Sequence, residues 1–312
     1  MKNKYNIFLS ADPLQRFERK LLAHPLIKGI RINTGAAFSG DKKSVVNQFK
    51  TDIYPLEVWI DLKCRELRLI EEATIPQDPL VLNHSISVKT PCGVYYNEGK
   101  EFLIIDQIID GNKLKIRQPK NKEFSGVIRF GKGTSLNIPE PSLKVEEFLT
   151  RSDKDYVHAA KDLDIHNYFL SYVEKPKDLY SILDLDPEAQ IFAKIESERG
   201  LDFVKNDFED FKESVHLIAA RADLYIELAQ LHHILNSLKL IIKKDPDAIV
   251  ASRLLLSFLN LEKIPLCADI CDVGYLLELG FKNFLFCDDL CKNQESLAAS
   301  LGLMEQILIN YV

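Results

Sequence analysis

The segment "AQIFAKIESERG" (189–200) places a lysine and a glutamate two residues apart in an otherwise apolar run. If this run is a β-strand, Lys194 and Glu196 point to the same side, because strand side chains alternate between two faces. Asp223 follows another apolar run, and Glu196 with Asp223 could hold Mg²⁺ or Mn²⁺, which prefer oxygen ligands. The ammonium of Lys194 beside such a metal would neutralise charge on an enolate oxygen. A structural salt bridge between Lys194 and Glu196 is the alternative.

Polar residues also stand at the ends of the other apolar runs. In chain order, the full set is Arg31, Asn33, Asp61, Lys63, Glu66, Arg68, Ser171, Lys194, Glu196, Arg221, Asp223, Ser252, Arg253, Asp288 and Asp289. Taken singly, such a residue is most often part of a solvated loop. Arg31 and Arg68, however, are suited to grip a phosphate or a carboxylate with two parallel hydrogen bonds. A metal, an ammonium and two guanidiniums together predict a pocket for a small dianionic or trianionic substrate.

Eight short apolar runs alternate with stretches of helical period. The runs are 5–10, 27–33, 56–62, 167–173, 190–196, 215–220, 247–252 and 283–287. Helical period is clearest at 222–244 and at 154–164, and Ser152-Asp153 is a helix-start signal before the second stretch. Strands that alternate with helices favour parallel βα units, and eight of them predict an α/β fold, a closed (β/α)8 TIM barrel. Active sites of such barrels lie at the carboxyl ends of the strands, where the polar residues stand.

The interval 71–137 breaks this rhythm, because it contains turn residues such as Asp110-Gly111-Asn112 and no helical stretch. Short β-strands are expected there at 85–90, 101–109, 113–118 and 126–131. We predict a small all-β lid domain at 71–137, inserted after the third strand of a barrel formed by 1–70 and 138–312. An insertion at the carboxyl end of a strand would cover the active-site face.

The composition excludes several classes of protein. Hydrophobic residues make up 46% and charged residues 28%, as in ordinary globular proteins. The net charge of −6 gives no general attraction to nucleic acids or anionic membranes, so we expect neither as a partner. No apolar run approaches the roughly 20 residues of a membrane span. The segment 1–20 lacks the pattern of a signal peptide, and we therefore expect a cytoplasmic protein.

Two cysteine pairs, Cys267-x3-Cys271 and Cys287-x3-Cys291, repeat a spacing that some zinc sites use. No histidine and no glycine-rich knuckle stands nearby in the sequence. Small buried thiols are therefore favoured over a metal cluster.

Seven segments resemble motifs of the pyruvate kinase family, and they follow one another in the family's order. "GIRINTG" resembles R-x-N-x-S, "WIDLKCRELR" resembles D-T-K-G-P-E-I-R, and "SLNIPEPSLKVEEFLTRSDKDYVHAAK" resembles the stretch after the family's lid. "FAKIESERG" is similar to A-K-I-E-N-x-x-G and "AARADLYIEL" to V-A-R-G-D-L-G-V-E. "IVASRLLLSF" and "ADICDV" are similar to T-A-T-Q-M-L-E-S-M and A-E-V-S-D-V. The resemblance implies a barrel that binds phosphoenolpyruvate or pyruvate, with ADP or ATP as the nucleotide.

The resemblance also implies roles for individual residues. Lys194, Ser252 and Arg31 would be catalytic: the lysine stabilises the enolate, the serine replaces a threonine that serves proton transfer, and Arg31 contacts the transferred phosphoryl group. Glu196 and Asp223 would bind the divalent metal. The implied substrate contacts are Arg31, Arg68, Lys63, Ala222, Asp223 and Ser252. Asn33 and Asp61 would belong to a monovalent-cation site for K⁺.

The sequence also departs from the family's pattern. Gly35 and Leu62 replace two of the four expected K⁺ ligands, although Glu66 remains. Ala222 adds a methyl group where the family has glycine beside the substrate carboxylate. The family's S-G-E-T-A becomes the segment 287–291, and the lid is shorter than usual. The chain ends after a helical stretch at 295–312, so we expect the family's C-terminal regulatory domain, with its effector site and one oligomer interface, to be absent.

Three interpretations remain open. The first is phosphoryl transfer between phosphoenolpyruvate and ADP, which needs mainly positioning and charge neutralisation. The second is a metal-dependent lyase, aldolase or decarboxylase that forms the same enolate from a 2-keto acid. The third is a non-catalytic protein that binds pyruvate-like acids or a protein partner. The sequence predicts no particular oligomeric state.

Overall fold

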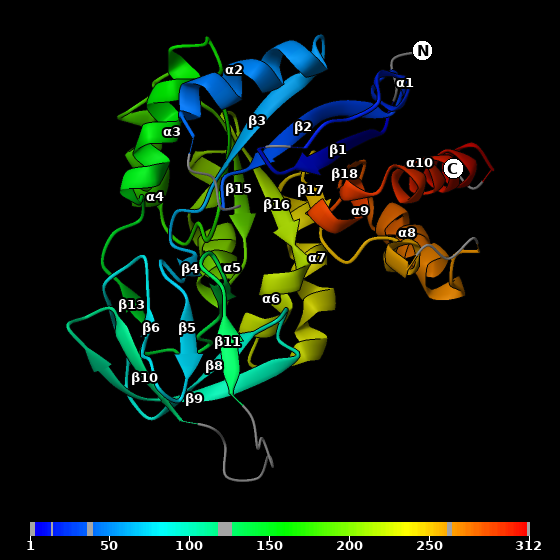
Figure 1. The fold of residues 1–312 in the computed structure, drawn as a ribbon. Helices are drawn as coiled ribbons and strands as arrows, with labels where there is room; N and C mark the ends of the chain where they lie inside the picture. Colours follow the sequence, from blue (N-terminus) through cyan, green and yellow to red (C-terminus); the bar gives the residue numbers. More distant parts are fainter. Residues whose placement is uncertain (1–3, 14, 36–39, 118–126, 261–263, 311–312) are drawn as a thin grey trace.

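Eight parallel strands close into a barrel in the computed structural model, which describes residues 4–13, 15–35, 40–117, 127–260 and 264–310. The order around the barrel is β1-β18-β17-β16-β15-β14-β3-β2 (Figure 1). The bounds are β1 (Asn6–Ala11), β2 (Ile27–Asn33), β3 (Glu57–Leu62), β14 (Asn167–Leu170), β15 (Gln190–Ile195), β16 (Val215–Ala220), β17 (Ile249–Ala251) and β18 (Asn283–Leu285). Each strand overlaps one of the eight runs expected from the sequence. The prediction of a (β/α)8 barrel is confirmed.

Helices surround this barrel and cover its outer face with apolar side chains. They are α1 (Arg19–Leu22), α2 (Lys42–Ile53), α3 (Arg151–Lys161), α4 (Pro176–Leu183), α5 (Glu198–Asn206), α6 (Arg221–Glu227), α7 (Ile234–Lys244), α8 (Cys267–Leu279), α9 (Asp288–Lys292) and α10 (Gln294–Asn310). Short 3-10 turns occupy Phe208–Asp210, Leu231–His233 and Leu256–Asn260. Within the described part of the chain, no helix combines the length and the apolar character that crossing a membrane requires.

Two helical stretches differ from the sequence-based expectation. Helix α3 begins before Ser152, because Thr150 is its N-cap and forms a capping box with Asp153. The stretch 222–244 is not one helix. Leu228 is extended, with φ −79° and ψ 131°, and the N–H of Ala229 donates to the carboxylate of Glu198 at 3.0 Å. The chain therefore leaves α6 there and resumes a helix only at α7.

An aromatic layer fills the interior of the barrel. Its rings have centroids 4.8–6.1 Å apart and come from Phe8, Trp59, Phe169 and Phe192. Because strand side chains alternate, the next inward-facing residues lie two positions further toward the carboxyl end. On β3 that residue is Asp61, and on β15 it is Lys194. The aromatic layer thus forms the floor beneath the polar residues.

The insertion after β3 is antiparallel and contains no helix in its described residues. Its strands are β4 (Leu67–Arg68), β5 (Ala73–Ile75), β6 (Leu80–Val81), β7 (Ile86–Ser87), β8 (Cys92–Tyr96), β9 (Glu101–Ile109), β10 (Lys113–Arg117), β11 (Ile128–Phe130), β12 (Ser135–Leu136) and β13 (Lys144–Val145). A four-stranded sheet, β6-β10-β9-β8, packs over a hydrophobic core of its own. Each of the four expected strands has a counterpart, although the ends at Gln118 and Gly126 lie outside the described residues.

Two short antiparallel strand pairs join the beginning of the inserted segment to its end. β4 pairs with β12, and β7 pairs with β13, so the pairing begins at Leu67 and ends at Val145. These residues lie slightly outside the interval 71–137. The division of the chain at those boundaries stays a prediction.

Candidate active site

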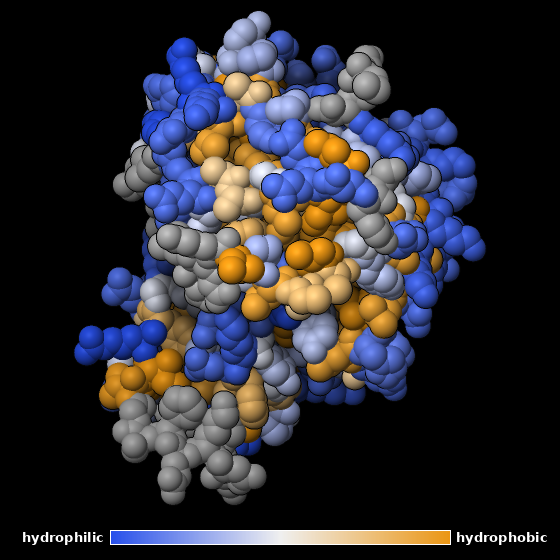
Figure 2. All heavy atoms as spheres, turned by 90° about the vertical axis from the view of Figure 1, so that its right-hand side faces the viewer, coloured by the Kyte–Doolittle hydropathy of each residue, from blue (hydrophilic) through white to orange (hydrophobic). Residues whose placement is uncertain are grey.

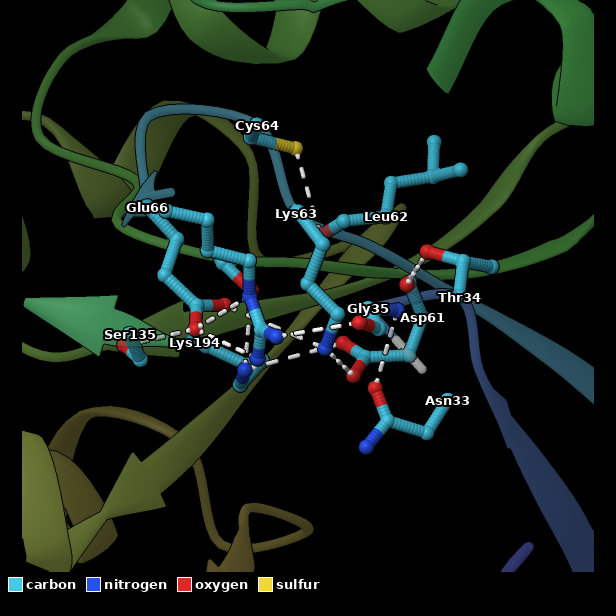
Figure 3. Close-up of polar contacts among 12 residues, drawn as sticks. Asn33, Thr34, Gly35, Asp61, Leu62, Lys63, Cys64, Glu66, Ser135 and Lys194 are labelled. Atoms are coloured by element: carbon cyan, nitrogen blue, oxygen red, sulfur yellow. Dashed lines mark hydrogen bonds and ion pairs between the residues drawn. The ribbon is translucent and has the colours of Figure 1, made fainter. Parts of the chain in front are cut away.

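Lys194 is buried among the polar residues at the strand ends, close to Asp61 and Glu66 (Figure 3). Its Nζ is 3.0 Å from Oε1 of Glu196, 2.8 Å from Oγ of Ser171 and 3.6 Å from Oδ1 of Asp61. Burial would lower the pKa of Lys194, but Asp61, Glu196 and Glu66 outweigh it and raise the pKa. The ammonium therefore stays charged at neutral pH, surrounded by carboxylates on β3, directly after β15 and in the segment between β3 and β4.

Glu196 and Asp223 are the carboxylates that could hold a divalent metal. Oε2 of Glu196 accepts a hydrogen bond from the backbone N–H of Tyr172 at 2.8 Å, and Oδ1 of Asp223 accepts one from Asn137 at 3.1 Å. Burial raises the pKa of Glu196 to about 7, and Asp223 and Glu66 add to this effect. Burial also raises the pKa of Asp223. A cation between the two carboxylates would relieve this repulsion.

The donor set fits Mg²⁺ or Mn²⁺ without forming a complete cage. Among the described residues, no group of three His, Cys, Asp or Glu side chains could hold a metal. Mg²⁺ is often held by only one or two carboxylates, with substrate oxygens and waters in the remaining positions. Glu196 and Asp223 would leave such positions open.

Arg31 is held between two carboxylates. Its Nε and Nη2 lie 2.9 and 2.8 Å from Oδ2 of Asp61, and Nη2 is also 3.5 Å from Oδ2 of Asp288. Asp288 accepts a further hydrogen bond from Nδ2 of Asn33 at 3.0 Å, while its Oδ1 is buried and without a hydrogen-bond partner among the described residues. Two acidic groups therefore share the guanidinium that the resemblance assigns to the phosphoryl group.

Lys63 lies where the resemblance implies a monovalent cation. Its Nζ is 2.6 Å from Oδ2 of Asp61 and 3.8 Å from Oε2 of Glu66. Asn33, the second implied ligand that the chain retains, uses its Oδ1 to accept the N–H of Gly35 at 3.1 Å. Oδ2 of Asp61 and Oδ1 of Asn33 therefore already have partners within the protein, whereas the buried Oδ1 of Asp61 has no hydrogen-bond partner among the described residues and lies 3.6 Å from Nζ of Lys194 (Figure 3).

Gly35 makes room for two basic side chains. A Cβ at this position would lie 2.5 Å from Cζ of Arg68 and 2.7 Å from Cε of Lys63. Arg68 uses the space to donate from Nη1 to the carbonyls of Gly35 at 3.1 Å and of Gly133 in the lid at 2.7 Å. Its Nε donates to Oε1 of Glu66 at 2.9 Å. The residues present therefore do not fit a monovalent cation.

A polar link between the inserted β segment and the barrel was not predicted from the sequence. Nδ2 of Asn137 lies 2.7 Å from the hydroxyl of Tyr172, 3.1 Å from Asp223 and 3.3 Å from Glu227. Burial raises the pKa of Glu227 to about 8, and the nearby Asp223 and Glu174 carboxylates add to the effect. Glu227 stands four residues after Asp223, and this spacing on a helix was the signal that could have identified it.

Other expected residues have different surroundings. Arg221 donates from Nε and Nη2 to the backbone carbonyl of Ser252 at 3.1 and 2.8 Å, and from Nη1 to Asp272 on α8 at 2.7 Å. Ser252 has a left-handed backbone with φ 67°. Ala222 lies between Arg221 and Asp223 in the first turn of α6. Arg253 is exposed and lies over the ring of Tyr225, and Asp289 is exposed and pairs with Lys292; the catalytic and binding roles of Ser252 and Ala222 stay predictions.

The closed parallel barrel, its antiparallel insertion after β3 and the charged centre at the strand ends define a (β/α)8 barrel protein with an antiparallel β insertion. The family model "Pyruvate kinase, barrel domain" matches residues 26–278, and the chain belongs to the pyruvate kinase family. No curated protein matches the chain. The family expected from the seven motifs is thereby confirmed.

Proposed function

We propose that this chain is a divalent-metal-dependent enzyme that acts on a pyruvate-type acid through its enolate, and transfers a phosphoryl group between phosphoenolpyruvate and ADP. The observation that carries the proposal is the position of Lys194. Its buried ammonium stands 3.0 Å from Glu196, one of the two candidate metal ligands, and 2.8 Å from Ser171. A fixed positive charge in a site that excludes water stabilises a developing enolate oxygen far better than water does.

Other residues of the site would bind and orient the substrate. Mg²⁺ or Mn²⁺ held by Glu196 and Asp223 would supply a positive charge for the carboxylate and enolate oxygens of the substrate. Arg31 orients the phosphoryl group, and the hydroxyl of Ser252 supplies the proton when the enolate is converted to pyruvate. Arg68 fixes the lid through Gly133 and limits the access of water.

A second candidate is favoured by the contact between Arg31 and Asp288. The carboxylate of Asp288 lies 3.5 Å from Nη2 of Arg31. It therefore neutralises part of the positive charge of Arg31 that would otherwise bind a phosphoryl group. A substrate without a phosphoryl group would not compete with Asp288. The same enolate chemistry could then serve carbon–carbon cleavage or decarboxylation of a 2-keto acid.

The exchange of methyl protons of pyruvate in D₂O tests the proposal. With Mg²⁺ or Mn²⁺, we expect NMR to show exchange for the parent protein and its loss in Lys194→Ala. Lys205→Ala removes an exposed lysine and serves as the control, with exchange unchanged. Added phosphoenolpyruvate and ADP should then yield ATP. Exchange of the methyl protons without formation of ATP favours the second hypothesis, a lyase, aldolase or decarboxylase. If the parent shows no exchange, or if Lys194→Ala behaves like the parent, both enzyme hypotheses are overturned. The hypothesis that then remains is a non-catalytic protein that binds pyruvate-like acids.

A further inference from the structure

Two exposed cysteines stand side by side in the first turn of α8, outside the site described above. Cys267 is the first residue of the helix and Cys271 follows one turn later, with their Sγ atoms 3.8 Å apart. Both side chains are exposed. They lie in a region of scattered exposed apolar residues, which includes Ile264, Leu266 and Ile270. The face that carries α8 and α10 shows such apolar patches between hydrophilic side chains (Figure 2).

The pair is independent of the other C-x3-C segment. Sγ of Cys291 is buried in the barrel and accepts the N–H of Ser10 at 3.4 Å. The four cysteines therefore do not form one metal cluster, in agreement with the lack of any three-ligand group among the described residues. Cys267 and Cys271 therefore form a pair of thiols on the surface of α8, apart from the other four cysteines.

The distance between the two sulfurs is suited to reversible oxidation. A disulfide has an S–S length near 2.0 Å, so at 3.8 Å the thiols are reduced but within a short movement of bonding. Cysteines that sense oxidants are accessible and stand next to a second cysteine that resolves the first oxidation product. Cys271 follows Cys267 by one helical turn, with its sulfur in contact, and is therefore placed to resolve the oxidation product of Cys267.

Bond formation must deform the first turn of α8. Residues four apart on a helix have Cβ atoms about 5–6 Å apart, whereas a disulfide needs about 3.5–4.5 Å. Bond formation therefore draws Cys267 and Cys271 toward each other and distorts both of the first two turns; Leu266, the residue before Cys267, is already extended with ψ 144° and does not continue the helix on that side.

The second turn of α8 is bonded to the segment that follows β17. Asp272, directly after Cys271, accepts a hydrogen bond from Arg221 at 2.7 Å. Nη2 of Arg221 also holds the carbonyls of Ser252 at 2.8 Å and of Arg253 at 3.0 Å. Movement of Cys271 would therefore displace Asp272 and loosen the contact that fixes Ser252.

We propose that Cys267 and Cys271 form a reversible disulfide on exposure to hydrogen peroxide, and that this bond loosens the Ser252 segment through Asp272 and Arg221. The thiolate of Cys267 attacks one peroxide oxygen, the O–O bond breaks, and a sulfenic acid and a hydroxide result; the hydroxide takes up the proton that the thiol had released and becomes water. The sulfur of Cys271 then attacks that of Cys267; the S–S bond forms, the S–O bond breaks, and the departing hydroxide takes the thiol proton as a second water. Two electrons pass from the sulfurs to the peroxide, and a dithiol reductant reverses the step.

Thiol titration with peptide mapping under non-reducing conditions tests the bond. We expect mild peroxide to remove two of the six thiols of the parent, to join Cys267 to Cys271 within one chain, and to be reversed by a dithiol. Cys267→Ser and Cys271→Ser should each abolish this bond, whereas the control Cys92→Ser, in the lid, should keep it. A bond between two chains, or sulfinic and sulfonic acids at either position, overturns the proposal.

Hydrogen exchange tests the coupling without any assay of enzyme activity. Oxidation should speed backbone exchange in the segment 252–257, and Asp272→Asn should have the same effect in the reduced protein. If the bond forms and exchange in that segment stays unchanged, the coupling through Arg221 is wrong. Because these readouts need no substrate, their failure is distinct from failure of the proposed reaction.

Discussion

The ammonium of Lys63 lies 2.6 Å from Oδ2 of Asp61, the carboxylate that the family resemblance assigns to a monovalent cation. Arg31 reaches the same oxygen at 2.8 Å, and Lys194 stands 3.6 Å from the other. Burial would raise the pKa of Asp61, but Arg31, Lys194 and Lys63 outweigh it and hold the pKa well below its usual range. The charge of Asp61 is thus balanced within the protein.

The first prediction is that K⁺ has no specific effect. The thermal midpoint and the rate of pyruvate proton exchange should be the same in potassium chloride and in tetramethylammonium chloride of equal ionic strength. In Lys63→Met, loss of one partner of a buried ion pair should cost about 3 kcal/mol, and K⁺ should recover part of that stability. A parent protein that is stabilised or activated by K⁺ alone would contradict this assignment.

The second prediction concerns Asp288 and the phosphoryl group. Asp288→Asn removes a negative charge 3.5 Å from Arg31, so phosphoenolpyruvate should bind more tightly, by about tenfold or 1.4 kcal/mol. Calorimetry should show little change for pyruvate, which has no phosphoryl group. Asp289→Asn, at an exposed neighbouring carboxylate paired with Lys292, is the matched control and should change neither affinity. An equal gain for both ligands would show that Asp288 does not select against phosphate.

The third prediction is a loss of stability of the metal-free protein as the pH rises. The pKa of Glu227 is raised from 4.5 to about 8 on folding, and that of Glu196 to about 7. The folded state therefore binds these protons more tightly, and the resulting stability is complete below pH 4.5 and declines as the pH rises through 7 to 8.

Glu227→Gln separates the contribution of this residue. Glutamine imitates the protonated carboxyl, so the variant should match the parent near pH 4 and exceed its thermal midpoint near pH 8, since one pKa unit corresponds to about 1.4 kcal/mol. Thermal melts at several pH values measure the difference between the thermal midpoints of the two proteins. A gap of the same size at both values of pH would mean that packing, not proton binding, distinguishes the two proteins.

The fold was largely predictable because it depends on local patterns. The runs 27–33 and 215–220 coincide with β2 and β16, since a buried parallel strand is a short continuous apolar run. The break within 222–244 was not predictable in this way. It depends on Glu198, which accepts the N–H of Ala229 from another part of the chain. Local helical period contains no information about such a tertiary contact.

The candidate site likewise has features that local sequence spacing predicts and features that depend on tertiary contacts. Lys194 and Glu196 were placed together because the period of a strand fixes their direction. Lys63 likewise stands two residues after Asp61 on β3, so the strand period also brings these two side chains together. That Asn33 at the end of β2 bonds to Gly35 instead of facing an open cation position required the structure. The replacement at Gly35 was visible in the sequence as a lost ligand. Its other consequence, space for Arg68 and Lys63, required the structure.

The last prediction restores the family's serine at that position. In Gly35→Ser, the new Cβ would fall 2.5 Å from Cζ of Arg68 and 2.7 Å from Cε of Lys63. Both are flexible side chains that can shift, so the fold should persist with a loss of about 1 kcal/mol, at the lower end of overpacking costs. The control Gly131→Ser has no atom within 4 Å of its Cβ and should be neutral. Because Arg68 also holds the carbonyl of Gly133, hydrogen exchange near that residue should rise in Gly35→Ser alone. A thermal midpoint equal to that of Gly131→Ser would show that the two basic side chains do not need the space that Gly35 leaves.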